Sequence, residues 1–507
     1  MQGRFASGQE IGLGEHNNTP TPQENENAQI APICETDNQE NLPKIEVIEK
    51  KSIVTNMGAN MGRWIFVTCL LLAAAILLTY TLTAAAWRRA YTETLLEQQK
   101  IIQGLSSADS EVADNLEILN FILEKSFFYA ETMDEKAMLE AAYKAYVAAS
   151  GDAYARYYTE EEYREILSSN QAELCGIGVG VLEYVFRMAG ETSDRLGFYI
   201  HEIYEESTAL DNGIQIGDWV YAVEINGQMK TVTELGYTAA VNAIRGDENT
   251  TVKIWIYRPD DQGGGESISS VLTRHKFETK SVKETVLESD PTIGIVKIAT
   301  FDLKTPSQFK AAIQKLKNHG VKQFVFDLRG NLGGDLQSIK AIASYFLQKG
   351  DLVLEAISRD GDVVASYCAE AVTHMDPAYV DCDVAEEEIG MYADLDMVVL
   401  CNKSTASAAE VFVATMQDYG LAKVIGTQTY GKGIMQSTRR VSFADSVGYI
   451  KFTTYAYQTK RGESYHGVGI TPDYVVELSE ASKELPLLLL GQEQDEQLKT
   501  AVQILTA

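Results

Sequence analysis

The stretch Cys401-Asn-Lys-Ser-Thr-Ala-Ser-Ala-Ala-Glu410 joins an apolar run, Met397–Cys401, to a segment with a helical apolar stripe, Ala408–Tyr419. A buried strand that leads into a helix is the repeating unit of an α/β fold, and other apolar runs and helical stretches alternate around this one. The junction places Ser407 at the start of the predicted helix. This stretch therefore predicts both the class of the fold and a place for chemistry.

Two interpretations of Ser407 are geometrically compatible. A serine followed three residues later by Glu410 is typical of a capping box, in which the serine serves only as the helix N-cap. The start of a helix also offers free N–H groups and partial positive charge to a developing oxyanion, which suits a nucleophile. No histidine lies between Ser407 and the glycine-flanked Lys432. The pattern therefore indicates a hydrolase in which a lysine amine is the base.

Lys432 must be neutral to accept a proton. Its pKa would have to fall from about 10.4 to near 7 through burial, which corresponds to roughly 4–5 kcal/mol of differential solvation. If residues 432–436 are extended, Gln436 faces the same side as Lys432 and can orient its amine. The alternative is that Gln436 is an ordinary polar strand residue.

A second loop is predicted to complete the site. Phe324-Val-Phe-Asp-Leu-Arg-Gly-Asn-Leu-Gly-Gly334 is an apolar strand that enters a glycine-rich loop without the spacing and lysine of a phosphate-binding loop. Backbone N–H groups of Gly333 and Gly334, together with that of Ala408, suit an oxyanion hole. Asp327 and Arg329 are predicted to form a local structural pair.

Residues 171–260 read as short strands with one helix. The landmarks, in order, are Gly176–Val181, Phe198–Ile203, Trp219–Gly227, the helical Ala239–Ile244 and Thr251–Tyr257. This order resembles a PDZ domain. The resemblance implies that the loop Gly176, Ile177, Gly178 and Val179 points N–H groups at the terminal carboxylate of a peptide that adds as a strand. A glycine-rich loop by itself also fits a tight turn.

Taken together, the motifs resemble the carboxyl-terminal processing, or tail-specific, proteases over residues 113–478. The matching motifs are Asp152–Arg156, the PDZ-like segment, Asp327–Gly334, Ser404–Glu410, Gly431–Gly433 with Gln436, and Gly467–Asp473. Ala409 departs from the family pattern, because a third serine is common there. The resemblance implies that Ser407 is the nucleophile, Lys432 the general base and Gln436 its orienting partner.

The predicted organisation is that of a multidomain α+β and α/β protein, because 507 residues exceed one compact core. Trp64–Trp87 is uncharged, longer than the roughly 20 residues that span a bilayer, and ends in tryptophans, so we expect a single membrane anchor rather than a signal peptide or a buried helix. The expected segments are a disordered tail (1–62), a transmembrane helix (63–88), a helical lead-in (89–170), the PDZ domain (171–260), an α/β peptidase core (261–480) and a C-terminal helical segment (481–507).

The net charge and the cysteine spacing limit which classes of partner and cofactor are expected. The formal net charge of −29 argues against a general nucleic-acid binder. A small surplus of basic residues before the predicted span favours a cytoplasmic tail and a catalytic part outside the cytoplasm. The six cysteines show no metal-binding spacing, so neither a metal nor a cofactor is expected. Cys368 and Cys382 can pair if that region lies outside the cell.

These expectations describe a membrane-anchored serine endopeptidase. It would recognise proteins with apolar C-termini through the PDZ domain and cleave through an acyl-enzyme, with a homodimer as a possibility. The rival hypothesis is a catalytically silent PDZ receptor for the tails of exported proteins. His466 offers a Ser–His alternative, but it lies in a turn after Gly462.

Overall fold

The structure, a computed structural model, describes residues 111–507 except 205–206, 261, 444–445, 463 and 484. The chain divides into two compact units, residues 1–130 and 131–507. Of the first unit the structure describes mainly α2 (Glu111–Ser126). The predicted tail (1–62) and membrane span (63–88) lie outside the described residues. Among the helices of the described residues, none is long and apolar enough to cross a bilayer.

The lead-in of the second unit contains α3 (Glu135–Ala148) and α4 (Glu160–Asn170). A capping box opens α4: Thr159 N–H donates to Glu162 at 2.9 Å, and Glu162 N–H donates to the Thr159 hydroxyl at 3.2 Å. Between these two helices, the segment expected to be a helical lead-in (89–170) contains a short strand. There β1 (Arg156–Thr159) pairs antiparallel with β18 (Val447–Gln458), because its tyrosines and threonine suit a strand with a partner available.

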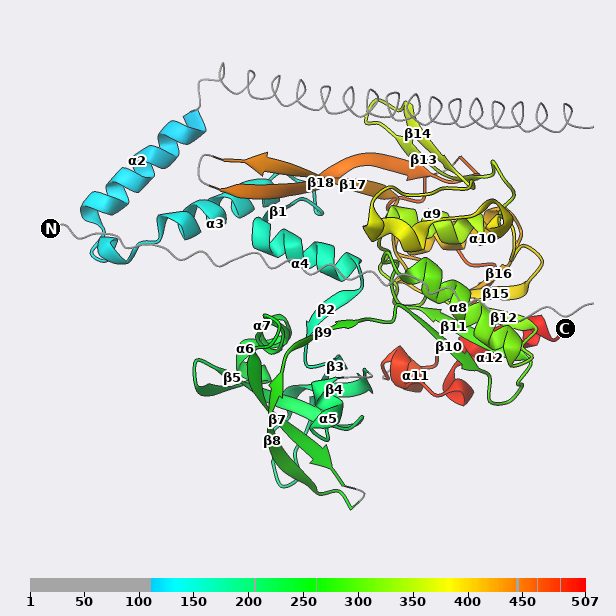
Figure 1. The fold of residues 1–507 in the computed structure, drawn as a ribbon, viewed down its shortest axis with the longest axis horizontal. Helices are drawn as coiled ribbons and strands as arrows, with labels where there is room; N and C mark the ends of the chain where they lie inside the picture. Colours follow the sequence, from blue (N-terminus) through cyan, green and yellow to red (C-terminus); the bar gives the residue numbers. More distant parts are fainter. Residues whose placement is uncertain (1–110, 205–206, 261, 444–445, 463, 484) are drawn as a thin grey trace, which may run out of the picture. The chain divides into compact units, whose positions relative to one another are not determined.

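A smaller domain follows, built on the strand order β3-β4-β5-β7-β8 with β6 added to β5 (Figure 1). One core of its own holds it together, with Phe198, Ile200 and Ile254 fully buried. The predicted boundary at 260 falls inside this sheet, because β7 continues into its antiparallel partner β8 and the chain returns through β9 to pair with β2. The elements are β2 (Glu173–Gly176), β3 (Val179–Phe186), β4 (Arg195–Ile203), α5 (Thr208–Asp211), β5 (Trp219–Ile225), β6 (Gln228–Thr231), α6 (Val232–Leu235), α7 (Tyr237–Ile244), β7 (Thr251–Pro259), β8 (Gly265–Thr273) and β9 (His275–Glu278).

The α/β core is a six-stranded sheet in the order β10-β11-β12-β15-β16-β19. The β10 strand is antiparallel to β11, and the other neighbours are parallel. Phe324 and Phe326 face one core with α8, α9 and α10, whereas Val325 faces a second core with α12. The predicted α/β arrangement is therefore confirmed as three layers. The elements are β10 (Val282–Val286), β11 (Ile293–Ile298), α8 (Thr305–Asn318), β12 (Gln323–Asp327), α9 (Leu336–Ser344), β15 (Asp396–Cys401), α10 (Ala408–Asp418), β16 (Lys423–Gly426), β19 (Tyr474–Val475) and α12 (Glu496–Leu505).

A second sheet of the core has the order β1-β18-β13-β14, with β17 (Ile434–Ser442) also paired to β18. Its remaining strands are β13 (Leu352–Ile357) and β14 (Val363–Cys368). Cys368 and Cys382 are both free, so the suggested disulfide is absent from the described structure. Cys382 is fully buried instead.

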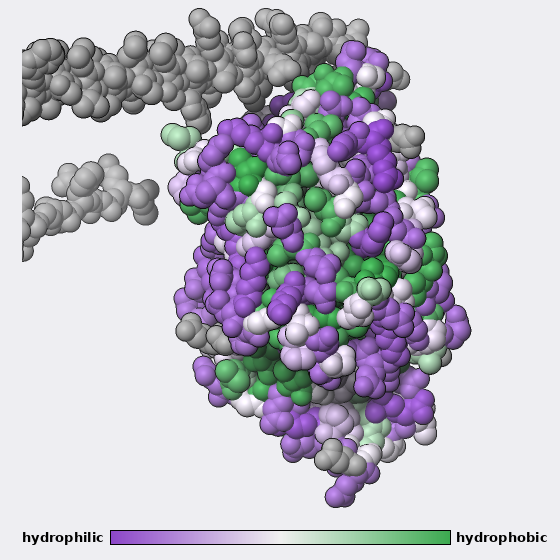
Figure 2. Space-filling model, turned by 90° about the vertical axis from the view of Figure 1, so that its right-hand side faces the viewer, coloured by the Kyte–Doolittle hydropathy of each residue, from purple (hydrophilic) through white to green (hydrophobic). Residues whose placement is uncertain are grey.

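The predicted helical C-terminal segment is helical only in part. It consists of the short α11 (Glu480–Lys483), two 3-10 turns at Leu487–Leu489 and Gln492–Gln494, and α12. On the face that Figure 2 shows, hydrophilic residues cover most of the surface and apolar residues form patches between them.

Candidate active site

Ser407 lies where β15 leads into α10, as the sequence predicts. It is the N-cap of α10, with φ 58° and ψ −121°. A positive φ is costly for a residue with a Cβ and is retained where the surroundings impose it, often at functional sites. The Ser407 hydroxyl makes no capping hydrogen bond. Capping alone therefore does not account for this serine, whose hydroxyl instead lies within hydrogen-bond reach of the Tyr457 hydroxyl.

Glu410 joins the start of α10 to the lysine loop. Its fully buried carboxylate accepts four hydrogen bonds. One oxygen accepts the N–H of Ser407 at 2.9 Å and the N–H of Lys432 at 2.8 Å. The other accepts the hydroxyl of Thr429 at 2.6 Å and the N–H of Gly431 at 2.7 Å. The sequence identifies Glu410 only as a cap residue, since its partners at 429–432 are set by the fold.

Lys432 has a lowered pKa. Burial is the main cause, and the nearby charge of Lys451 adds to it against the opposing carboxylates of Glu410 and Asp152. The Lys432 Nζ lies 4.6 Å from the ring centroid of Tyr154. Within the described residues, no hydrogen bond joins the Lys432 amine to the Ser407 hydroxyl. The fold thus ties the two backbones to one carboxylate, while the two side chains are not yet engaged.

Tyr457 supports the lysine loop from β18. Its hydroxyl donates to the carbonyl of Lys432 at 2.6 Å, and its N–H donates to the carbonyl of Gly433 at 3.0 Å. Burial raises the pKa of Tyr457, so the phenol stays a neutral donor. His466, the alternative base, is exposed, and its ring makes no hydrogen bond within the described residues.

Lys451 offers a test of the electrostatics around Lys432. It lies on β18 opposite Arg156 of β1, and its own pKa is lowered by burial and by that guanidinium. Replacement by methionine removes a positive charge that disfavours protonation of Lys432. We expect Lys451→Met to raise the pKa of Lys432, so that the acid limb of the kcat/KM profile moves to higher pH. An unchanged or lowered midpoint in the pH profile would contradict this.

Gln436 lies on β17, and within the described residues no hydrogen bond joins its amide to the Lys432 amine. An extra residue in β18 shifts the register, so that Gln436 pairs with Thr453. The Gln436 amide donates to the Thr453 hydroxyl at 3.3 Å, and that hydroxyl donates to Asp152 at 3.2 Å. Asp152 also accepts the N–H of Tyr154 at 2.9 Å. Gln436 is therefore connected to the segment that carries Tyr154, and its predicted role as the direct partner of the Lys432 amine stays a prediction.

The glycine loop lies directly against the nucleophile. A Cβ at Gly333 (φ 103°) would stand 2.7 Å from the Cβ of Ser407 and 2.9 Å from the nitrogen of Ala408, so only glycine fits. The Gly333 N–H, however, donates to the side chain of Asn331 at 2.8 Å. Within the described residues, the N–H groups of Gly334 and Ala408 have no acceptor. Of the three predicted oxyanion donors, these two are free.

Arg329 fixes the start of this loop through buried contacts to three side chains. The predicted pair with Asp327 is confirmed, with two hydrogen bonds at 3.0 and 2.9 Å. Burial alone would raise the pKa of Asp327, but Lys297 and Arg329 hold it below its usual range. Arg329 has two further partners that were not predicted, Asp495 at 2.7 Å and Gln497 at 2.9 Å, and these contacts anchor the start of α12. Asp495 and Gln497 lie far from Arg329 in the sequence, so no local sequence pattern predicts these contacts.

Removal of Asp495 should destabilise the protein. The side chain is buried and also caps α12, so Asp495→Ala leaves part of the Arg329 charge unmatched. We expect a loss of about 3 kcal/mol or more in the free energy of unfolding, measured by urea denaturation. Glu493→Ala, an exposed change in the same segment, is the matched control. Equal stability of the two variants would show that the Arg329 contact contributes little.

A strained serine at a helix start, a lysine of lowered pKa on the same buried carboxylate and free N–H donors beside them are the parts of a serine-type peptidase. The sequence model of peptidase family S41 matches residues 292–476, the segment that contains all three. The match assigns residues 292–476 to peptidase family S41.

Two similar proteins carry the same description as serine proteases. The "Probable CtpA-like serine protease" of Staphylococcus aureus (strain bovine RF122 / ET3-1) is 28% identical over 418 residues, which cover 82% of this chain and 73% of that protein. Its counterpart in Staphylococcus saprophyticus is 29% identical over 374 residues, covering 74% and 67%.

Two solved structures are also similar. An S41 protease from Bacteroides fragilis has a TM-score of 0.48 and 18% identity, covering 76% of this chain and 96% of that one. The photosystem II D1 C-terminal processing protease has a TM-score of 0.39 and 21% identity, covering 70% and 86%.

Proposed function

We propose that this S41 serine peptidase cleaves proteins that it selects by their C-terminal tails. The Ser407 oxygen attacks the substrate carbonyl and its proton passes to the Lys432 amine. The N–H groups of Gly334 and Ala408 hold the oxyanion. The leaving amine takes the proton from Lys432, and water then hydrolyses the ester at Ser407 in the same way.

The Glu410 carboxylate carries this proposal. It places the backbones of Ser407 and Lys432 within hydrogen-bond distance of one oxygen, 2.9 and 2.8 Å away. The proposal requires the Lys432 side chain to rotate so that its amine reaches the Ser407 hydroxyl. The lowered pKa of Lys432 supports its use as a base.

Tail recognition rests on the smaller domain, which we assign to the PDZ class. Within the described residues, β3 pairs only with β4, so its other edge is free to accept a strand. The loop before β3 is held by packing against the smaller domain. Ile177 is buried, and Gly178 (φ 75°) admits no side chain because a Cβ would collide with Ser207. A rigid loop at the end of a free edge suits capture of a terminal carboxylate.

The location is also part of the proposal. The uncharged run Trp64–Trp87 supports a single anchor in the cell membrane, with the peptidase outside the cytoplasm. Its substrates would then be exported or membrane proteins with apolar C-termini.

The test compares two peptides that differ only at the C-terminus, one with a free carboxylate and one amidated. With the full-length protein in detergent, we expect kcat/KM to be about tenfold lower for the amidated peptide, since a charge-assisted contact to the loop is lost. Ser407→Ala should cleave neither. Equal rates for both peptides would rule out tail recognition, and equal cleavage by Ser407→Ala would rule out the assigned nucleophile.

A further inference from the structure

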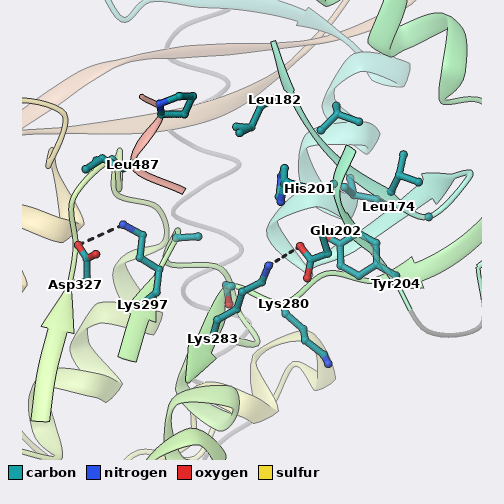
Figure 3. Close-up of a pocket in the computed structure, with 18 of the residues that line it drawn as sticks. Leu174, Leu182, His201, Glu202, Tyr204, Lys280, Lys283, Lys297, Asp327 and Leu487 are labelled. Atoms are coloured by element: carbon teal, nitrogen blue, oxygen red, sulfur yellow. Dashed lines mark ion pairs between the residues drawn. The ribbon is translucent and has the colours of Figure 1, made fainter. Parts of the chain in front are cut away.

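A cavity of about 820 Å³ extends from the free edge of β3 to the C-terminal segment of the chain. Its walls come from β3 and α7 on one side, and from β10, β11, Pro486, Leu487 and Leu490 on the other. Figure 3 shows Leu487 across the cavity from His201 and Leu174. We propose that Leu487 and Leu490 bind the penultimate side chain of the substrate tail. This inference rests on the tail recognition proposed above.

The alternation of β3 assigns the two faces of an added strand. Val179 and Val181 pack toward the core of the smaller domain, which also includes Val241 and Ile244 of α7. Gly180 and Leu182 therefore turn to the opposite face. A peptide strand that adds to this edge alternates in the same way, so its last and third-last side chains face α7. Its penultimate side chain faces the other wall.

Two lysines of that other wall have ion-pair partners, whereas Lys280, which also lines the cavity, is exposed and has no ion-pair partner among the described residues. Lys283 pairs with Glu202 at 2.7 Å, and Lys297 pairs with Asp327 at 3.3 Å, as Figure 3 shows. A charged penultimate residue beside Leu487 and Leu490 would lose hydration next to two lysines that already have partners. Leu487 and Leu490 are only partly buried and line the cavity, so they gain by covering an apolar group.

This wall therefore adds a sequence requirement to those that β3 and α7 alone would impose on the substrate tail. β3 and α7 contact the last and third-last side chains of the tail, and without the C-terminal wall the penultimate side chain would face solvent. The C-terminal wall adds a preference for a bulky apolar residue at the penultimate position. The deciding residues lie outside the segment 292–476 that matches the family model.

The experiment measures binding without cleavage. Full-length Ser407→Ala protein is titrated with two fluorescent peptides that differ only in leucine or serine at the penultimate position, and Kd is read by anisotropy. We expect the serine peptide to bind about five- to tenfold more weakly. In the added double variant Leu487→Ser/Leu490→Ser, this difference should fall below about twofold. Leu489→Ser, a neighbour that does not line the cavity, is the matched control and should keep the full difference.

A second peptide pair, varied at the third-last position, separates the possible failures. If Kd depends on the third-last but not on the penultimate residue, the C-terminal wall is not a binding surface, although tail recognition stands. If neither position matters, tail recognition by β3 fails as well. Tighter binding of a peptide with penultimate aspartate would also overturn the inference. Thermal unfolding of the double variant, and retention of the preference by Leu487→Met/Leu490→Met, exclude simple misfolding as the cause.

Discussion

Lys432→Met should lower kcat/KM by at least about 10³-fold, because it removes the base that accepts the Ser407 proton. The same change should not destabilise the fold. The pKa of Lys432 is lowered in the folded protein, so the unfolded chain binds this proton more tightly, and stability is lost as the pH falls below the ordinary lysine value. A neutral methionine removes that penalty. Loss of activity with an unchanged or higher Tm would therefore identify Lys432 as a catalytic group rather than a structural one.

The pH dependence gives a second readout of the same assignment. In the wild-type protein, kcat/KM should rise with pH as Lys432 loses its proton, with a midpoint below the usual lysine range. Lys432→Arg keeps a permanent charge and should be as inactive as Lys432→Met. Ser407→Ala sets the background rate. More than a tenth of wild-type activity in Lys432→Met, or a falling limb where a rising one is expected, would exclude the amine as base.

The local part of the site could be predicted from sequence because it depends on short-range geometry. The strand that leads into a helix at Ser407, the capping box of α4 and the pair of Asp327 with Arg329 all lie within a few residues. Gly333 follows the same logic, since a loop that must approach another backbone closely needs a residue without a Cβ.

The remaining features depend on contacts between distant segments. The role of Glu410 arises only when the fold brings the lysine loop to α10. Asp152 and Tyr154 reach the site because β1 adds to β18, a pairing that a helical reading of this region concealed. An extra residue in β18 shifts the pairing of Gln436 to Thr453, and Lys432 lies outside β17, so strand alternation does not relate the two side chains. A register shift of this kind leaves no mark in the pattern of side chains.

Glu410→Gln should lower kcat by about 10²–10³-fold and destabilise the protein by roughly 3 kcal/mol. Four donors converge on this buried carboxylate, and each oxygen accepts two of them. An amide has only one acceptor oxygen, so its NH2 group must face two donors, whichever way it is turned. The backbones of Ser407 and Lys432 then separate, or the start of α10 frays.

A kinetic readout distinguishes positioning from a general loss of structure. Measured well below its Tm, folded Glu410→Gln should show a much lower kcat with KM little changed, because the peptide groove of the smaller domain is intact while the serine and lysine are misaligned. Gln417→Ala, on the same helix and bonded instead to Thr471, is the matched control and should retain near wild-type kcat. Wild-type kcat in stable Glu410→Gln would mean that Ser407 and Lys432 are aligned by contacts other than this carboxylate. In that case the capping interpretation would account for Glu410. Tyr457 and the glycine loop would then be the contacts that align Ser407 and Lys432.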